Sequence, residues 1–299
     1  MKIKTNYAFV IPAILILMLS SGCSMKPKLT ERIVFELGNE IGIPDSLSAM
    51  VTDINKIDET VDIIQKRLNS YGISHQIERN PATNDYTLWL PEKINIGATK
   101  RLISTVGKIE IWETWNIFTG GPPQPDDSIY KFINYSSSRL TPLLVPRKEV
   151  NEVENMMKRY AKTKQWPQNI KYAWGQKPAD EKGDVYELYM LRSANNPQSP
   201  VITNNHIENA SYGRNQKNWI IDIVLNTAGA SRFEKVTREN VGQPLAIVVD
   251  DKVYSAPVVN SPIIGGRLQV SGNFTRDDAE KFASILKYEA LPLTVKIKE

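Results

Sequence analysis

Two pairs of adjacent carboxylates are the residues of this chain best suited by type to acid–base chemistry or to binding a cation. The pairs are Asp250-Asp251 and Asp277-Asp278. The first pair follows an apolar run and is expected in a tight turn between two strands, where adjacent side chains point apart. The second pair is expected in the first turn of a helix, where the helix dipole alone favours acidic residues. We therefore predict that neither pair is catalytic or binds a metal.

Histidine and cysteine are too few to build a metal centre. The chain has two His residues, His75 and His206, which fall in different predicted subdomains, and a single Cys, Cys23. A structural zinc site normally takes four Cys or His ligands, and one cysteine cannot form an internal disulfide. The sequence also contains no Gly-x-Ser-x-Gly motif, no Walker A loop and no Gly-x-Gly-x-x-Gly loop. We expect a protein that is not an enzyme and that uses no cofactor and no metal.

The composition is that of a folded chain with little net charge. Of its 299 residues, 41% are apolar and 23% are charged, and the formal net charge is +4. This length predicts about two domains, and the composition excludes collagen-like and extensively disordered chains. The Lys-Arg pairs are short and lie among acidic residues, whereas a nucleic-acid-binding domain usually concentrates its basic residues in one stripe. We expect no nucleic-acid partner.

The first part of the chain predicts a ferredoxin-like subdomain over residues 32–117, after a tether at 23–31. Apolar residues at helical spacing over 57–68 predict a helix, and Gly72 follows where a C-terminal cap belongs. The other expected elements are a strand at 32–37, a hairpin at 75–90, a helix at 98–106 and a strand at 108–115. The resulting order, βαββαβ, is that of the ferredoxin-like fold.

Three further regions complete an α+β chain. Residues 118–200 begin with Gly120-Gly121-Pro122-Pro123 and turn polar, so we expect an insertion or linker there. Residues 201–274 alternate strands and a helix around the predicted Asp250-Asp251 turn and form an α+β head. Residues 275–299 read as a capped helix and a strand that return to the base. We expect this helix to pack on the base through one apolar face, made of Ala279, Phe282, Ala283 and Leu286.

Several segments in the last third of the chain resemble one family in order and spacing. They are Asn240-Val241-Gly242, Leu245-Ala246-Ile247-Val248-Val249-Asp250, Val253-Tyr254-Ser255-Ala256-Pro257, Ile263-Ile264-Gly265-Gly266 and Ser271-Gly272-Asn273-Phe274-Thr275. Together they strongly resemble the head subdomain of the large periplasmic domain of SecD, a component of protein export. Upstream, residues 66–73 and 109–114 resemble the base subdomain, especially that of the fused SecDF proteins of Bacteroidetes. The resemblance extends from about residue 54 to residue 297.

The resemblance covers only the periplasmic domain of SecD, so it implies only the functions of that domain and not those of the membrane helices. SecD has transmembrane helices with a proton pathway, whereas this sequence has no further apolar run of spanning length and stops where the family enters its second membrane helix. We therefore expect a non-catalytic relative of the SecD periplasmic domain that binds exported, unfolded polypeptide or Sec translocon components. The alternative is an envelope adaptor or structural module that reuses the fold for a purpose unrelated to export.

One apolar stretch of the head is the expected contact surface for such a partner. An apolar, partly open groove can accept an extended chain by strand addition with little sequence preference. The alternative is ordinary burial in the core of the head. The candidate contact residues are Tyr254, Ser255, Ala256, Pro257, Val258, Ile263, Ile264, Gly265 and Gly266.

The first 22 residues read as a signal peptide. Lys2 and Lys4 precede an uncharged stretch at 8–19, which is too short to span a membrane as a helix. The stretch ends in Leu19-Ser20-Ser21-Gly22-Cys23, which resembles the lipobox of bacterial lipoproteins. That resemblance implies cleavage after Gly22, a lipid on the thiol of Cys23, and a membrane anchor in the cell envelope. The Ser that follows Cys23 indicates the outer membrane, facing the periplasm, if the cell is Gram-negative; an unlipidated secretory signal is the alternative.

Overall fold

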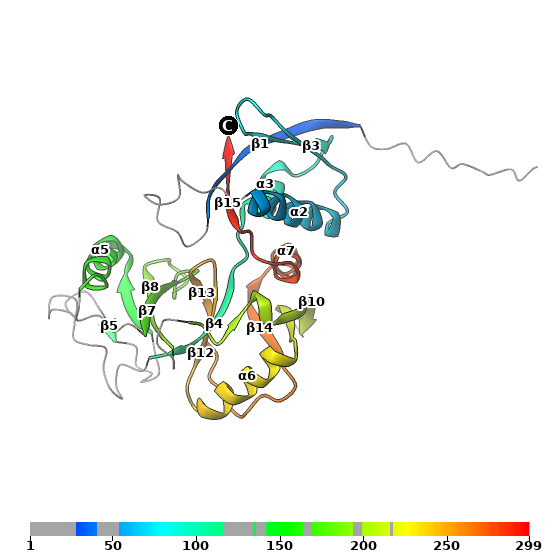
Figure 1. Cartoon of the computed structure of the whole chain (residues 1–299). Helices are drawn as coiled ribbons and strands as arrows, with labels where there is room; N and C mark the ends of the chain where they lie inside the picture. The colour runs from blue at the N-terminus through cyan, green and yellow to red at the C-terminus, as the bar shows by residue number, and fades with distance from the viewer. Residues whose placement is uncertain are drawn as a thin grey trace, which may run out of the picture.

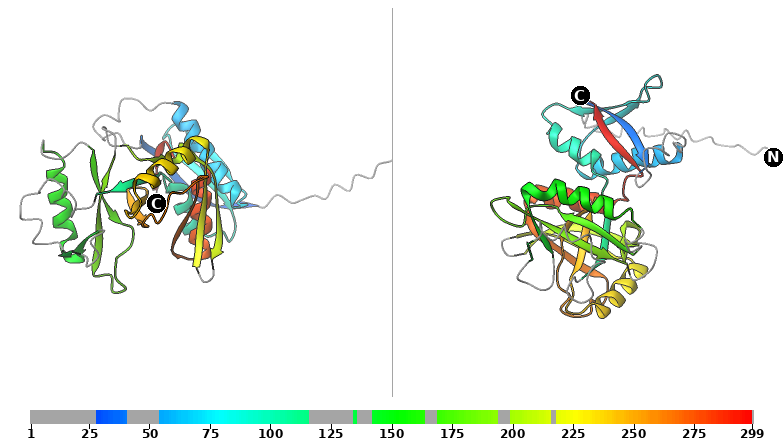
Figure 2. Two further views of the ribbon diagram at one scale, coloured as in Figure 1. Left: turned by 90° about the horizontal axis from the view of Figure 1, so that it is seen from below. Right: turned by 90° about the vertical axis from the view of Figure 1, so that its left-hand side faces the viewer.

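The computed structural model describes residues 28–40, 54–115, 134–135, 142–163, 169–193, 199–215 and 218–298. The expected signal peptide, Cys23 and the Gly120–Pro123 break lie outside these residues. The chain forms two lobes, one above the other in Figure 1 and separated again in the right-hand view of Figure 2. We call the upper lobe the base and the lower lobe the head. The expected α+β class is confirmed.

The base is a four-stranded antiparallel sheet with two helices. Its strands follow the order β15-β1-β3-β2. The strands are β1 (Leu29–Glu40), β2 (Gln76–Arg79), β3 (Tyr86–Pro91) and β15 (Leu293–Lys298), and the helices are α2 (Ile54–Ser70) and α3 (Ile96–Ser104). Phe35 of β1 pairs with Ile297 on one side and Tyr86 on the other, and the Phe35 and Tyr86 rings stack at 5.3 Å. The apolar faces of α2 and α3 close this core with Ile64, Leu68 and Ile103.

The fourth strand of the base differs from the sequence prediction. The strand expected at 108–115 is β4 (Ile109–Thr114), but it lies in the head, where it pairs antiparallel with β12 (Leu245–Val249). The C-terminal strand β15 completes the base sheet instead. All six residues of β4 are buried, which fits a strand with neighbours on both sides in the middle of a larger sheet. A pattern of apolar residues along one strand does not specify the partner strand.

The head contains an eight-stranded sheet in the order β5-β6-β8-β7-β13-β12-β4-β9. Its other strands are β5 (Asn134–Tyr135), β6 (Leu143–Pro146), β7 (Ile170–Gly175), β8 (Val185–Arg192), β9 (Ile202–Thr203) and β13 (Lys252–Ser255). Because β8 also pairs with β4, strands β8, β7, β13, β12 and β4 close into a ring. The ring encloses a small apolar core of Trp112, Ala173, Tyr189, Leu191, Ala246, Val248 and Val253.

The region expected as an insertion or linker is therefore part of the head. Residues 118–200 supply β5 to β8 and a helix, α5 (Val150–Tyr160), which follows a short 3₁₀ turn, η2 (Arg147–Glu149). Val153 and Met157 of α5 pack against Leu188 and Met190 of β8 in a separate apolar cluster.

The rest of the head is a three-stranded antiparallel sheet, β10-β11-β14, with two helices. These elements are β10 (Ile207–Asn215), β11 (Asn218–Leu225), β14 (Arg267–Phe274), α6 (Thr227–Glu239) and α7 (Arg276–Lys287), and a 3₁₀ turn, η3 (Asn204–His206), precedes β10. The side chain of Asn226 accepts from Gly229 N and begins α6. Thr275 and Asp278 form the capping box that begins α7, which confirms that sequence prediction.

Helix α7 packs on the head and not, as expected, on the base. Ala279, Phe282, Ala283 and Leu286 lie in the head core, and the Phe282 ring stacks on Tyr254 at 5.0 Å. Only one residue separates β14 from α7, so the helix folds back onto its own sheet. The neighbouring face of α7 reaches the base through Ile285, which belongs to the base core.

Two short segments connect the lobes, and one buried arginine donates hydrogen bonds to both. Residues 105–108 run from α3 into the head and 288–292 return, and Leu291 N donates to Val106 O over 2.9 Å. Arg67 of α2 is 0% exposed. Its guanidinium donates to Thr105 O, to Val106 O at 2.8 Å and, more weakly, to Glu289 O at 3.5 Å. We call this arrangement the joint.

Candidate functional site

A partly open, mainly apolar cavity of about 350 Å³ lies in the head against α6, and its lining also includes the polar residues Asn260, Ser261, Arg267 and Gln269. Buried Ile111 of β4 and Ile247 of β12 contribute to its apolar lining. Phe233 and Thr237 of α6 line one side, and the segment from Pro257 to Ile263 and the start of β14 line the other. The cavity is therefore built by both head sheets and by one helix.

One exposed apolar side chain lines this cavity, and two more lie next in sequence to segments that form it. Val258 is 41% exposed and Ile264 is 72% exposed, and Val241, just after α6, is 50% exposed. Large apolar side chains in a small area of surface are typical of interaction sites. We refer to the cavity with these three residues as the apolar groove.

The backbone around the apolar groove is held in place. Gly242 N donates to Val259 O over 2.8 Å, and Val259 N donates to Gln243 O over 3.0 Å. Ile263 N donates to the hydroxyl of Thr237 over 2.9 Å. These bonds connect the segment after β13 to α6 and to the turn that follows it, so the exposed apolar side chains are presented by an ordered segment.

The structure divides the predicted contact residues into three sets. Pro257, Val258 and Ile263 line the apolar groove, and Ile264, the next residue, is exposed. Ser255 ends β13, and partly buried Ala256 packs on the core of the ring. The predicted contact surface is therefore not one continuous patch.

The remaining three predicted residues have other roles. Tyr254 stacks on Phe282 and lines a different cavity, near the joint. Gly265 and Gly266 have φ of +84° and +64°, which favour glycine. A Cβ on Gly266 would lie 2.6 Å from the Cβ of Ala230, so this glycine also allows the turn to approach α6.

Part of the apolar groove lies outside the stretch predicted from the sequence. Phe233 and Thr237 belong to it although neither lies in the stretch that was singled out. Their spacing of four residues places both side chains on one face of a helix, so this pattern in the sequence could have identified them as neighbours. Ile111 could not be identified because its strand was assigned to the base.

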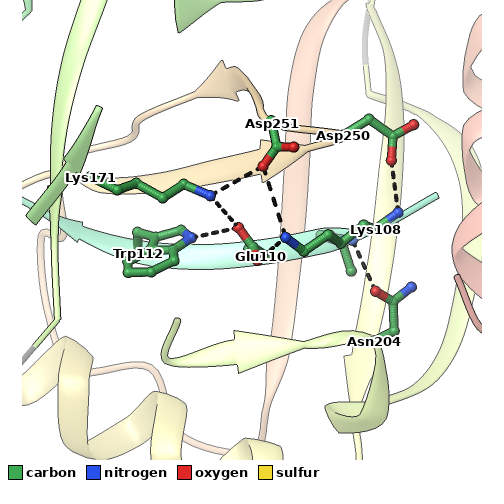
Figure 3. Close-up of polar contacts among 8 residues, drawn as sticks. Lys108, Glu110, Trp112, Lys171, Asn204, Asp250 and Asp251 are labelled. Atoms are coloured by element: carbon green, nitrogen blue, oxygen red, sulfur yellow. Dashed lines mark hydrogen bonds and ion pairs between the residues drawn. The ribbon is translucent and has the colours of Figure 1, made fainter. Parts of the chain in front are cut away.

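A second cluster, of charged residues, lies where the head meets the joint (Figure 3). Glu110 of β4 is 4% exposed. Its Oε1 lies 2.7 Å from Lys108 Nζ, and its Oε2 lies 2.9 Å from both Lys171 Nζ and Trp112 Nε1. Burial raises the pKa of Glu110, but the two lysines and the indole N–H outweigh it and hold the pKa below its ordinary value. Both oxygens are paired, so this carboxylate is structural.

The Asp250-Asp251 pair forms the tight turn that was predicted. The two residues join β12 to β13 with φ of +47° and +61°. Asp250 Oδ1 accepts from Lys108 N over 2.8 Å, and Asp251 Oδ1 lies 3.2 Å from Lys171 Nζ. Burial raises the pKa of Asp250, and the backbone N–H groups at 107 and 108 oppose the change. The two carboxylates point to different partners in Figure 3.

The other candidates for chemistry also have local structural partners. Asp278 caps α7, and Asp277 forms an ion pair with Lys281. His75 Nδ1 lies 2.8 Å from Ile73 O, and His206 completes a capping box at the 3₁₀ turn η3 before β10. Within the described residues, no group of three or more His, Cys, Asp or Glu side chains could hold a metal ion. None of the helices in the described ranges has the length and apolar character needed to cross a membrane.

The fold and the groove together define a class: a two-lobed α+β domain whose head presents a mainly apolar groove. Residues 186–293 match the family of the SecDF P1 head subdomain. The solved structure described as SecDF in super-membrane-facing form superimposes with a TM-score of 0.55 at 19% identity, over 90% of this chain and 29% of that one. A second structure, of a membrane component SecDF that enhances protein export, gives 0.54 at 19% identity, over 90% of this chain and 98% of that one.

Curated relatives agree with these matches. The chain is 25% identical over 245 residues to protein translocase subunit SecD of Magnetococcus marinus, which covers 81% of this chain and 38% of that protein. It is 47% identical over 79 residues to SecD of Calditerrivibrio nitroreducens, covering 26% of this chain and 15% of that protein. The chain thus spans well under half the length of these relatives. It is similar to the SecD and SecDF proteins, and residues 186–293 match the SecDF P1 head subdomain.

Proposed function

We propose that this protein is a lipid-anchored, non-catalytic component of the cell envelope that binds unfolded polypeptide during protein export. The observation that carries the proposal is the apolar groove, whose lining residues, apart from Ile111, lie in the part of the chain that matches the P1 head. The relatives are translocase subunits, and this relatedness supports an association with export. We interpret the base as ferredoxin-like, with β15 in the place of the fourth strand.

The size of the apolar groove fits weak and unselective binding. A cavity of about 350 Å³ takes one large apolar side chain of a passing polypeptide, with Val258 and Ile264 covering its neighbours. Burying one such side chain contributes about 1.5 to 3 kcal/mol, whereas a dissociation constant of 1 mM already needs about 4 kcal/mol. A single captured residue therefore holds a chain only briefly, and lasting contact needs several adjacent residues.

Photo-crosslinking tests polypeptide binding at the apolar groove. A photoreactive amino acid is placed at position 258, and the control is placed at Glu208, an exposed residue of β10. We expect crosslinks to unfolded exported polypeptide from position 258 and few from position 208. Equal yields from both positions, or none from position 258, contradict the proposal. Exclusive capture of one folded envelope protein favours the adaptor alternative.

The lipid anchor is proposed at Cys23, and its partner is the membrane. Metabolic labelling with a fatty-acid probe is expected to label the wild-type chain and not the Cys23→Ala variant, and only the wild type should sediment with membranes. Several acyl chains, each burying many CH₂ groups at about 0.8 kcal/mol, give stable anchoring. A Cys23→Ala variant that stays labelled and membrane-bound contradicts the anchor, while separation of inner and outer membranes tests the proposed outer-membrane location.

A further inference from the structure

Strand β14 has an unpaired edge beside the apolar groove. Within the described residues it pairs with β11 alone, as an outer strand of the β10-β11-β14 sheet. The first residues of β14, Arg267, Leu268 and Gln269, line the cavity of the groove. Strands β4 and β12 line the same cavity through Ile111 and Ile247 but do not pair with β14. The unpaired edge of β14 therefore borders the groove.

The hydrogen bonds to β11 show which backbone groups of β14 lie at this edge. Leu225 N donates to Gly266 O over 2.8 Å. The C=O and N–H of one trans peptide point in opposite directions, so the N–H of Arg267 points away from β11. Successive residues of an antiparallel strand direct their backbone groups to alternate edges, so Leu268 bonds to β11 and Gln269 again points outward. The backbone groups of Arg267 and Gln269 are thus available to another strand.

The segment that lines another side of the cavity also has unpaired backbone groups. Leu245 N donates to Pro257 O over 3.1 Å, and Val259 N donates to Gln243 O over 3.0 Å. Both bonds lie on one side of the segment, so the N–H and C=O of Val258 between them point to the other side. The apolar groove therefore offers backbone hydrogen-bonding groups from β14 and from Val258 in addition to its apolar surface.

The two faces of β14 differ in character. Leu268 packs against the head core and Val270 is 1% exposed, whereas the side chains of Arg267 and Gln269 are exposed. Side chains that lie opposite each other on neighbouring strands share one face of a sheet. A strand added to β14 would therefore direct every second side chain toward the core face, where the cavity lies, and the others toward the polar face.

We propose that the polypeptide at the apolar groove is bound as an added strand on the unpaired edge of β14. Its backbone exchanges hydrogen bonds with Arg267 and Gln269, which gives affinity for many sequences, and every second side chain enters the cavity. The segments bound best are those in which apolar and polar residues alternate. This inference rests on the proposed polypeptide binding and specifies its mode and its preferred segments. The backbone bonds supply the lasting contact that one captured side chain lacks.

Matched peptides titrated with the full chain test this mode of binding by fluorescence anisotropy. The probe is a short labelled peptide that alternates threonine with valine between terminal lysines, and its partner has the same side chains but a methyl group on every backbone nitrogen. Strand addition needs the backbone N–H groups, whereas side-chain capture alone does not. We expect saturable binding of the probe and at least about 10-fold weaker binding of the methylated peptide.

The outcomes separate the mode of binding from the proposed function. Equal binding of the two peptides overturns strand addition but leaves polypeptide binding in place. No saturable binding of either peptide up to about 1 mM contradicts both proposals. A third peptide of the same composition, with its valines in one block, should bind at least about 5-fold more weakly than the probe. Equal binding of this third peptide overturns the preference for alternating segments.

Proline variants connect the binding to the edge of β14. Gln269→Pro removes an outward N–H, a change that edge strands tolerate. Arg214→Pro is the matched control, because the same alternation places the N–H of Arg214 at the opposite edge of the sheet, on β10. We expect Gln269→Pro to weaken the probe at least about 10-fold and Arg214→Pro to bind it like the wild type. Equal binding by the two variants overturns the proposal, and if Gln269→Pro fails to fold, the methylated peptide decides.

A second copy of this chain is the other occupant that an unpaired strand edge allows. Light scattering of the full chain with and without the probe distinguishes the two occupants. We expect a monomer that binds the peptide. A dimer that Gln269→Pro converts to a monomer, and that the probe does not dissociate, overturns the proposal in favour of self-association through β14.

Discussion

Replacing Arg67 by Met should loosen the joint and destabilise the whole domain. The guanidinium is fully buried, and burial lowers its pKa to about 10, so it is still charged at pH 7. It makes two strong bonds, to Thr105 O and Val106 O, and longer ones of 3.5 Å to Leu102 O and Glu289 O. Each bond to a charged donor is worth about 1.5 to 3 kcal/mol. Met fills much of the space but removes the guanidinium donor from these carbonyl groups, of which Val106 O keeps its bond from Leu291 N.

We expect Arg67→Met to lower the free energy of unfolding by about 3 to 5 kcal/mol, if only the two strong hydrogen bonds are counted and the two longer ones are left out. This is a large part of a typical domain stability of about 5 to 15 kcal/mol. Urea denaturation followed by far-UV circular dichroism measures the loss, and limited proteolysis should show faster cleavage within residues 105–108. Arg67→Lys is the matched control, since its single ammonium can reach one segment of the joint but lacks the fork that reaches both. A midpoint for Arg67→Met within error of the wild type would refute this account of the joint.

Three further predictions concern the head and the joint. Phe282→Ala should lower the free energy of unfolding by about 3 to 5 kcal/mol, because it leaves a cavity in the head core beside Tyr254. Asp251→Gly should change it by less than about 0.5 kcal/mol, because the positive φ of this turn residue suits glycine. Thermal unfolding measures both, and a larger loss for Asp251→Gly than for Phe282→Ala would contradict this packing. The pKa of Glu110 is lower in the folded protein than its ordinary value, so the ionised carboxylate contributes fully to stability above the ordinary pKa. This contribution is lost as the pH falls through the lowered pKa. The thermal unfolding midpoint should therefore fall on acidification, and Glu110→Gln should make it less dependent on pH. Gly107→Ala should destabilise strongly, because its φ is +79° and a Cβ there would lie 2.3 Å from Ile285 Cγ2; unchanged melting would contradict the tight joint.

Local features of this protein could be predicted from the sequence, and long-range pairings could not. The Asp250-Asp251 turn and the Thr275–Asp278 capping box depend on residues within four positions of one another, and both are present. The face of α7 was identified correctly as apolar, but the stripe containing Phe282 does not say which core it enters. The same limit applies to β4, whose alternation is compatible with either sheet.

The candidate site shows the same division. Val258 and Ile264 stand out in the sequence because they are apolar residues in a turn-rich segment. Ile111 could not be assigned to the apolar groove, because its strand β4 reaches the head only through pairings with remote strands such as β12. Glu110 likewise appears as an ordinary strand residue until Lys171 arrives from a remote strand.

The pairing of β1 with β15 also sets an order of events for a chain that emerges from its N-terminus. Strand β1 lies between β3 and β15, so one of its edges stays open until residues 293–298 have appeared. The described strands and helices of the head all precede β15 in the chain, so the head can fold before the base sheet has its last strand. An open strand edge is a template for pairing with other chains. Pairing of the six-residue strand β15 with β1 is therefore the last step in folding of the base. A chain that ends before residue 293 would have a folded head and a base with an open strand edge, which favours aggregation.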